Sequence, residues 1–385
     1  MKKLVAVAAV FVAIGAAPFA GRVGAQNGKP INTGSANEET IAVFGDWPYS
    51  QSLLAAAPLL LESINSDPKV RLVIHVGDIH SGSMPCTGAD LNPLPATSVP
   101  HWNEGIFGIF EQFKDPVIYT PGDNEWTDCH KTNQGTSGDP LKELAAVRNL
   151  FFANPGYSLG GQKKRVISQA LNFDPMHPSD AQFVENVMWE ESQVVFVTLN
   201  VPGSNNDTLP WNGGSRTVPG NAPYSTSNPF VPPFLNEPAR AHEVSERDPA
   251  NSRWLARAFA LAEANNAKAV MVIIQADMWD STAALSAYQP LVFQLGDLSL
   301  HFGRPVLLVN GDSHLFEVDN PLASPGSVIG QIHKYPNAVP NLTRITVQGS
   351  TNVPHEWLRL TIDPRSHDVF SWTNVIYCDQ TTCPQ

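Results

Sequence analysis

The sequence predicts an α/β protein in which apolar strands alternate with helices. Short apolar runs rich in β-branched residues recur along the chain, and helix-like segments separate the early ones. This alternation extends through the first 150 residues, whereas the C-terminal part is rich in strand-like runs. Such an order is typical of β-α-β units in a mixed or parallel sheet.

Eight runs are predicted as strands because they are apolar and bounded by turn residues. They are Ile41 to Phe44, Leu72 to Val76, Pro116 to Thr120, Val194 to Leu199, Val270 to Ile274, Val306 to Val309, Arg344 to Val347 and Trp357 to Ile362. The predicted helices are Ser52 to Ile64, Trp102 to Phe113, Leu141 to Phe152 and Ser252 to Asn265. Two long interruptions, Asn154 to Asp180 and Pro202 to Pro238, are predicted to be loops at the rim of an active site.

Four of the predicted strands are followed by a Gly-Asp pair. The pairs are Gly45-Asp46, Gly77-Asp78, Gly122-Asp123 and Gly311-Asp312. A single pair of this kind is most often only a turn, but turn chemistry does not demand the same residue order four times. Carboxylates delivered to the carboxyl edge of a sheet can converge on hard cations. The sequence therefore predicts a metal centre.

The N-terminus has the pattern of a secretory signal peptide. Lys2 and Lys3 precede a run of small apolar residues, and Val23-Gly24-Ala25 matches a signal-peptidase site. We therefore expect a signal peptide at residues 1–25, a single domain at 26–385, and a secreted or periplasmic protein. An uncleaved N-terminal anchor is the alternative, and no later stretch is apolar and long enough to span a bilayer.

Net charge excludes one large class of partner. The formal charge of the chain is −12, and the predicted signal peptide contains three basic residues and no acid, so the mature chain would carry −15. A strongly acidic surface repels nucleic acid, and we expect no nucleic-acid binding. The oligomeric state leaves no signal in the sequence.

Four cysteines form an even set in a chain that is predicted to be exported, which favours two disulfides over a thiolate metal site. Three connectivities are possible. We favour Cys86 with Cys129, because each follows a Gly-Asp motif by a few residues, and Cys378 with Cys383 near the C-terminus.

Five blocks, taken in order, resemble the signature of the calcineurin-like metallophosphoesterases. They are Gly45-Asp46, Gly77-Asp78, Gly122-Asp123-Asn124-Glu125, Gln275-Ala276-Asp277 and Gly311-Asp312-Ser313-His314. In that family the blocks read Asp-x-His, Gly-Asp, Gly-Asn-His-Asp/Glu, a lone His after an apolar strand, and Gly-His-x-His, and they hold two divalent ions bridged by one Asp. The resemblance implies a four-layer α/β/β/α sandwich of two mixed sheets.

The resemblance also implies a set of metal ligands. The set consists of Asp46, Asp78, Asp123, Gln275, Asp312 and His314. Asp78 takes the bridging role, and Asp277 remains an alternative to Gln275. Most of these donors are oxygens that suit Mn, Mg or Ca, whereas His314 favours Zn or Fe, so one or two divalent ions of uncertain identity are expected.

Several positions depart from the family pattern. Pro48 stands where the first block has His, Asp123 where the third has Asn, Asn124 where the catalytic His is usual, and Gln275 and Asp312 where the later blocks have His. Asn124 can hydrogen-bond a phosphoryl oxygen but cannot donate a titratable proton to a leaving group.

Three residues close in the sequence to the second or third block are candidates for a substitute proton donor. They are His80, Glu125 and His130, of which His130 is favoured and His80 is expected at the rim.

The implied activity is hydrolysis of phosphomonoesters or phosphodiesters, in which water activated by a metal attacks phosphorus. The expected partner is a small phosphorylated substrate. Two alternatives remain: a non-catalytic binding protein on the same scaffold, and a secreted domain whose carboxylates hold calcium only for stability. No nucleotide-binding glycine loop and no Gly-x-Ser-x-Gly nucleophile motif occurs in the chain.

Overall fold

The computed structural model describes residues 38–86, 101–131, 139–211, 237–379 and 383, and all of them belong to one compact unit, Thr33–Gln385. The predicted signal peptide and residues 212–236 of the second predicted rim loop lie outside the described residues. The division into a signal peptide and a single domain stays a prediction.

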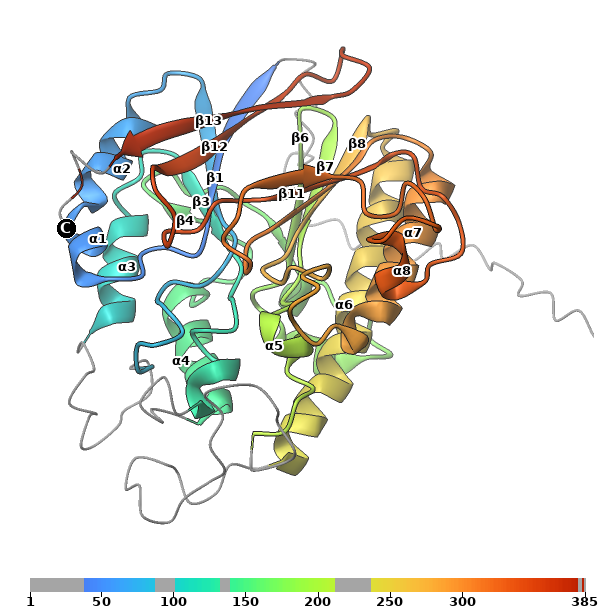
Figure 1. The fold of residues 1–385 in the computed structure, drawn as a ribbon, viewed down its shortest axis with the longest axis horizontal. Coiled ribbons are helices and arrows are strands. Elements are labelled where there is room, and N and C mark those ends of the chain that lie inside the picture. Colours follow the sequence, from blue (N-terminus) through green and yellow to red (C-terminus); the bar gives the residue numbers. More distant parts are fainter. Residues whose placement is uncertain (1–37, 87–100, 132–138, 212–236, 380–382, 384–385) are drawn as a thin grey trace, which may run out of the picture. The chain divides into compact units, whose positions relative to one another are not determined.

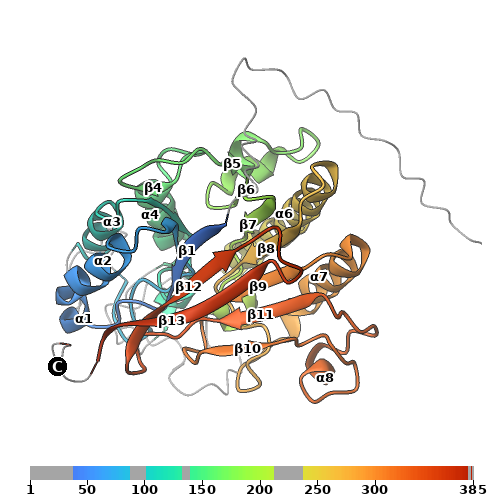
Figure 2. The ribbon, with the colours of Figure 1, turned by 90° about the horizontal axis from the view of Figure 1, so that it is seen from above.

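The strands form two sheets (Figures 1 and 2). The first has six strands in the order β13-β12-β1-β2-β3-β4. These are β1 (Glu39–Phe44), β2 (Val70–His75), β3 (Pro116–Tyr119), β4 (Leu159–Gly160), β12 (His355–Ile362) and β13 (Phe370–Cys378). Only β1, β2 and β3 pair in parallel, and the outer pairs are antiparallel, so the sheet is mixed.

The second sheet has seven strands in the order β10-β11-β9-β8-β7-β6-β5. They are β5 (Ile167–Ser168), β6 (Val187–Glu191), β7 (Val194–Thr198), β8 (Ala269–Ile273), β9 (Val306–Asn310), β10 (Glu317–Asp319) and β11 (Leu342–Thr346). Here β7, β8, β9 and β11 are parallel, and antiparallel strands lie at both edges. Each sheet thus has a parallel centre whose strands end at a common edge.

Helices lie along the outer face of each sheet (Figures 1 and 2). The described helices are α1 (Gln51–Ala55), α2 (Ala57–Asn65), α3 (Trp102–Phe110), α4 (Pro140–Phe151), α5 (Gly203–Asn206), α6 (Glu237–Ala264), α7 (Gln289–Phe302) and α8 (Gly330–His333). Helices α1 to α4 lie beside the first sheet, and α6 and α7 lie beside the second (Figure 2).

Alternation along the strands produces the layers. In β1, Ile41 and Val43 belong to the core between the sheets, whereas Ala42 and Phe44 pack with the helices of the first sheet. In β8, Met271 faces the other sheet while Val270 packs with the helices of the second sheet. Because successive strand residues point to opposite faces, both sheets are buried on two sides. The predicted four-layer α/β/β/α sandwich of two mixed sheets is confirmed.

All four predicted helices differ from the structure at one end or both, and two of them differ in more than their end residues. The predicted helix Ser52 to Ile64 is divided into α1 and α2, because Pro58 has no backbone N–H to continue the first helix and starts the second instead. The predicted helix Ser252 to Asn265 is the end of the much longer α6, which contains Pro249. Within the added part, the fully buried Arg247 forms an ion pair with Glu243, a contact that apolar spacing does not reveal.

One predicted rim loop is elsewhere in the molecule. Part of Asn154 to Asp180 pairs with the first sheet through Gly160, which lies opposite Pro116 at the start of β3, far along the strand from Gly122. Its far end, Asp180, forms an ion pair with Arg253 of α6. The prediction that this stretch forms the rim of the active site is therefore wrong, because it packs against the outer elements instead.

Candidate metal centre

The six predicted ligands come together at the carboxyl ends of the parallel strands. Asp46, Asp78 and Asp123 follow β1, β2 and β3 of the first sheet, and contacts from the second sheet reach them. The backbone N–H of Asp312, after β9, donates to Asp46 Oδ1 at 3.0 Å. The side chain of Gln275, after β8, donates to Asp78 Oδ2 at 3.2 Å. The site therefore forms across the two sheets.

The Gly-Asp order has a steric reason. A Cβ added at Gly122 would lie 2.0 Å from Asp78 Oδ1, and one at Gly311 would lie 2.3 Å from Asp46 Oδ2. Each carboxylate thus packs against the glycine of a neighbouring block, which only a residue without a side chain allows. Asp46, Asp78 and Asp312 themselves have positive φ values of 49°, 60° and 75°, a conformation that Asp tolerates better than most residues.

Two groups of side chains are arranged closely enough to hold a cation. We call Asp46, Asp78 and His314 the first donor group, and Asp78, Asp123 and Asp312 the second donor group. In each group one possible ligand atom per residue lies within 4.8 Å of the others. Asp78 belongs to both groups. Carboxylates and one imidazole are donors that divalent cations accept, so the residues fit the metal that the resemblance implies.

Burial of neighbouring carboxylates gives the site an excess of negative charge. Burial raises the pKa of Asp78 well above its usual range, and the charge of Asp123 adds to this effect. Burial raises the pKa of Asp123 to about 7, and it also raises that of Asp312, helped by Asp123 and Asp46. Burial disfavours charged His314, but the hydrogen bond and the charge of Asp46 outweigh it and raise the pKa of the imidazole. A bound cation would relieve this repulsion.

Gln275 enters the second donor group with its amide nitrogen. Its Nε2 lies 3.2 Å from Asp78 Oδ2 and 3.3 Å from Asp123 Oδ1, while its Oε1 accepts a hydrogen bond from Gly203 N at 2.6 Å. An amide nitrogen donates hydrogen bonds and does not bind metal, so Gln275 would have to turn its oxygen inward to act as a ligand.

The alternative ligand, Asp277, faces a different partner. Arg344 Nη1 forms an ion pair with Asp277 Oδ1 at 2.5 Å, and Ser313 Oγ donates to Asp277 Oδ2 at 2.8 Å. Its backbone N–H donates to Asp312 Oδ2 at 3.0 Å. Asp277 therefore supports the position of a predicted ligand, with its own carboxylate neutralised by Arg344.

Asn124 contacts the shared carboxylate twice. Its backbone N–H donates to Asp78 Oδ1 at 3.1 Å and its Nδ2 donates to Asp78 Oδ2 at 2.9 Å. Glu125, a candidate proton donor in the sequence, is fully buried, and its carboxylate holds neighbouring groups in place by hydrogen bonds. Its Oε1 accepts from Gly122 N at 2.7 Å, from Asp78 N at 3.2 Å and from Tyr119 Oη at 2.5 Å, so it fixes the two Gly-Asp turns relative to each other.

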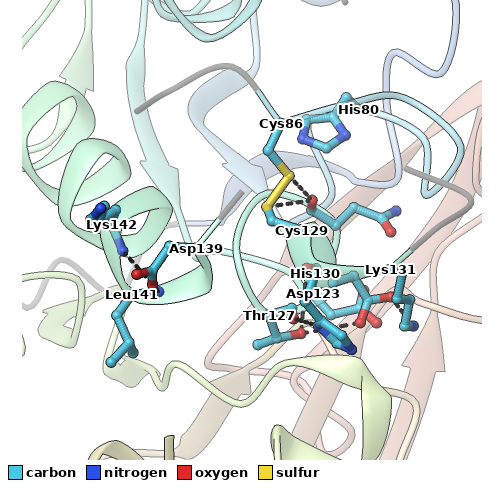
Figure 3. The surroundings of a disulfide bond; sticks show 12 residues. His80, Cys86, Asp123, Thr127, Cys129, His130, Lys131, Asp139, Leu141 and Lys142 are labelled. Atoms are coloured by element: carbon cyan, nitrogen blue, oxygen red, sulfur yellow. Dashed lines mark hydrogen bonds and ion pairs between the residues drawn. A yellow bond between two sulfur atoms is a disulfide. The ribbon is translucent and has the colours of Figure 1, made fainter. Parts of the chain in front are cut away.

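Both predicted disulfides are present, and the first lies beside the site. Cys86 and Cys129 join the loops that follow β2 and β3, and the carbonyl oxygen of Asn124 lies 3.3 Å from Cys86 Sγ (Figure 3). His80 lies next to this disulfide (Figure 3) and is buried, so the prediction that it is a rim residue is wrong. Burial lowers its pKa to about 4.

His130 directly follows Cys129 in the chain and is buried. Its Nδ1 lies 2.7 Å from the carbonyl oxygen of Thr127, and its ring packs near Trp211. Figure 3 shows it on the same side of the disulfide as Asp123 and Lys131. The assignment of His130 as a proton donor stays a prediction. His75, at the end of β2, is completely buried, and burial lowers its pKa to about 4.

Sequence reasoning missed Tyr49. Its hydroxyl lies 3.2 Å from Asp46 Oδ1, 3.0 Å from Asp78 Oδ2, 3.1 Å from His314 Nε2 and 3.1 Å from Asn124 Nδ2. Burial, reinforced by the charges of Asp78 and Asp46, raises the pKa of this phenol well above its usual value. One feature of the sequence could have indicated it. Pro48 replaces the His expected in the first block, and Tyr49 is the next residue with a polar side chain.

Ser204 and Lys131 also border the second donor group. Ser204 Oγ donates to Asp123 Oδ2 at 3.1 Å, and Lys131 Nζ donates to Ser204 Oγ at 2.8 Å. Ser204, Asn205, Asn206 and Asp207 all have φ between 52° and 59°, so α5 is a left-handed turn rather than an ordinary helix. Consecutive left-handed residues are costly, and strain of this kind concentrates at functional sites.

Three comparisons relate the chain to known proteins. The family model described as calcineurin-like phosphoesterase matches residues 39–217. One similar solved structure is titled "GAP50 the anchor in the inner membrane complex of Plasmodium"; the two chains are 10% identical, 90% of each is covered, and the TM-score is 0.40. A comparison with curated proteins found no match. Over residues 39–217, the chain belongs to the calcineurin-like phosphoesterase family.

Proposed function

We propose that the protein is an exported, metal-dependent hydrolase of small phosphomonoesters or phosphodiesters. The observation that supports this proposal most strongly is the meeting of four aspartates from two sheets, three of them buried and Asp312 half-buried, with a single imidazole. Like charges are costly to bury together unless a cation accompanies them. Metal-dependent phosphoester hydrolysis is the chemistry of the family to which the chain belongs.

The donor set favours one or two divalent ions. The carboxylates suit Mn, Mg or Ca, and His314 allows Zn or Fe in the first donor group. When bound, such an ion neutralises phosphoryl oxygens and makes water a better nucleophile. Asp46, Asp78, Asp123, Asp312 and His314 would hold it, and Gln275 would join them only after its amide has turned.

Asn124 is placed to orient a phosphoryl group by hydrogen bonding rather than to protonate a leaving group. Two hydrogen bonds to Asp78 fix its side chain and backbone, and an amide has no titratable proton for a leaving group. We therefore propose that substrates with good leaving groups are preferred. His130 is the proposed substitute donor where protonation is needed.

Export is supported by the cysteines. Both disulfides join cysteine pairs of the chain, and such bonds persist in oxidising compartments. Among the described helices, none is long and apolar enough to cross a membrane. The signal peptide and the secreted or periplasmic location belong to the proposal.

A second candidate is a non-catalytic binding protein that keeps the cation site. The orientation of Gln275 favours it, because an amide donor between Asp78 and Asp123 partly satisfies the carboxylates that would hold a second ion. Such a protein would retain one cation and recognise a phosphorylated or acidic ligand without hydrolysing it.

The test compares the unmodified protein with Asn124→His for a series of aryl and alkyl phosphates. We expect kcat/KM of the unmodified protein to fall steeply as the leaving-group pKa rises. In Asn124→His, the new imidazole should raise kcat/KM for the alkyl phosphates by about 10²-fold and so make the dependence less steep. Elemental analysis of both proteins is the control. Hydrolysis of neither series by protein with bound metal would favour the binding candidate.

A further inference from the structure

One sheet edge is much longer than the others that the structure describes. The nine-residue strand β13 pairs with β12 on one side and with no described strand on the other (Figure 2). The opposite edge of the same sheet, β4, has two residues, and the edge strands β10 and β5 of the second sheet have three and two. An edge strand directs alternate N–H and C=O groups away from its sheet, so a long edge can pair with a further strand.

The strand β13 also lacks the features that usually protect an edge. Its sequence, Phe-Ser-Trp-Thr-Asn-Val-Ile-Tyr-Cys, contains no charged residue and no proline, whereas two of the three residues of β10 are acidic. Charges, prolines and shortness are common means by which edge strands avoid pairing with other chains. The register shift against β12 affects only the end of β13 after Ile376. An unprotected edge therefore extends from Phe370 to Ile376.

One face of β13 continues the core between the sheets into solvent. Alternate strand residues share a face, and on this face Phe370 packs against that core, as does Leu360, the cross-strand partner of Trp372. Further along the same face, however, Trp372 is 36% exposed and Ile376 is 58% exposed. Two large apolar side chains are thus left partly uncovered along the open edge.

Charge favours a second copy of the chain as the occupant of this edge. The chain has a formal charge of −12, so two copies repel each other over most of their surfaces. Along β13 this repulsion is weakest, because the strand is uncharged. The nearest charged side chains on β12 are already engaged: Arg359 pairs with Asp67, and Glu356 accepts a hydrogen bond from Asn374 at 2.5 Å. Two copies can therefore meet here without placing like charges opposite each other.

Antiparallel pairing of two β13 strands about a two-fold axis suits this sequence. With the axis at Thr373, the middle residue of the run from Phe370 to Ile376, Phe370 would lie opposite Ile376 of the second copy and Trp372 opposite Asn374. The two Trp372 side chains would then be diagonal neighbours on one face, at a separation that aromatic side chains can bridge. Both copies use the same edge, so the assembly closes at two chains.

We propose that the protein forms a symmetric dimer in which the β13 strands of two copies pair antiparallel and join their six-stranded sheets into one continuous sheet. The pairing supplies hydrogen-bond partners for the outward N–H and C=O groups of β13 and covers Trp372. It requires neither a bound cation nor catalysis.

The experiment measures the oligomeric state of the full chain by sedimentation equilibrium, with a chelator and with Mn²⁺. Thr373→Lys and Thr373→Glu each place a charge at the proposed axis, at an exposed position opposite Arg359 of β12. An equimolar mixture of these two variants is measured as well. Val318→Lys is the matched control, because Val318 is 36% exposed on β10, an edge of the other sheet. Circular dichroism establishes that each variant is folded.

We expect the unmodified protein and Val318→Lys to dimerise with a Kd on the order of 1 μM, with and without Mn²⁺. Each Thr373 variant alone should dimerise about 10- to 100-fold more weakly, because two like charges meet at the axis. The mixture should regain the dimer, since Lys of one copy then meets Glu of the other, and a merely damaged strand would not give this result. A monomer at all micromolar concentrations, a dimer unaffected by the Thr373 substitutions, or a mixture no better than its components would overturn the proposal.

Discussion

The first and second donor groups share Asp78 and differ in what surrounds it. The first contains an imidazole, His314, and has the phenol of Tyr49 between its members. The second contains only carboxylates, and the amide nitrogen of Gln275 already donates to two of them. A cation entering the second group must displace both of these hydrogen bonds of Gln275, whereas one entering the first meets Asp46 and His314, to which Gln275 does not donate. The two positions are therefore not equivalent, and the first should bind more tightly.

The largest expected effect comes from removing what the groups share. Asp78→Asn takes a carboxylate from both, so we expect bound metal to fall to a small fraction of its normal content. Losing several kcal/mol of charge stabilisation corresponds to a decrease in kcat/KM of about 10³-fold. Elemental analysis and phosphatase assays measure the two effects. The substitution also replaces a carboxyl group whose charged form is disfavoured by burial, so the metal-free variant should be no less stable to urea. Full metal content would contradict the shared role.

A matched pair of substitutions separates the groups. Asp46→Asn removes a member of only the first group and Asp312→Asn a member of only the second. Both replace an aspartate by the same amide, at a buried position for Asp46 and at a half-buried one for Asp312. We expect Asp46→Asn to weaken the tighter Mn²⁺ binding step by about 10- to 100-fold, whereas Asp312→Asn should change only the weaker step. Calorimetric titration resolves the steps. Loss of the tighter step in Asp312→Asn would reverse the ranking of the two groups.

The smallest expected effect is on the pH dependence of stability without metal. Burial raises the pKa of Asp123 from 3.8 to about 7, so the folded chain binds more protons than the unfolded chain and loses stability as the pH rises through this range. The pKa values of His75 and His80 are lowered to about 4, so their contribution to the free energy of unfolding rises with pH below about pH 6.5. Above that pH their contribution is constant. From about pH 6.5 to 8, Asp123 alone should lower the free energy of unfolding by roughly 1 kcal/mol.

Urea denaturation at the two pH values, with a chelator and with Mn²⁺, measures this effect. The cation should stabilise the protein more at the higher pH, because protons compete with it less. Asp123→Asn should remove part of the decline. Burial raises the pKa of Glu39, at the start of β1, to about 7 as well, so Glu39→Gln is a control that should reduce the decline without changing the effect of the cation. Stability that rises with pH in the chelated protein would contradict the expectation.

Prediction from sequence succeeded where the local structure requires one particular residue type. Strands ending at Gly-Asp located the carboxylates, because only glycine tolerates the close packing seen at Gly122 and Gly311. Prediction failed where side-chain contacts, and not a local apolar pattern, determine how far an element extends. The first half of α6 is stabilised by contacts such as the Arg247–Glu243 ion pair, and no apolar period marks it.

The sequence by itself indicated the central strands, a favoured pairing of the four cysteines and, through the family resemblance, the six side chains that meet at the site, since each leaves a local pattern of apolar runs, Gly-Asp steps or spaced cysteines. The order of the strands within each sheet came from the structure. Tertiary structure alone decided which atoms those side chains present. Whether Gln275 offers oxygen or nitrogen depends on the N–H of Gly203, 72 residues away. Whether Tyr49 lies in the site depends on His314, which is 265 residues away. Local pattern specifies where a residue lies along a strand, but the contacts that orient it come from chain segments that only folding brings together.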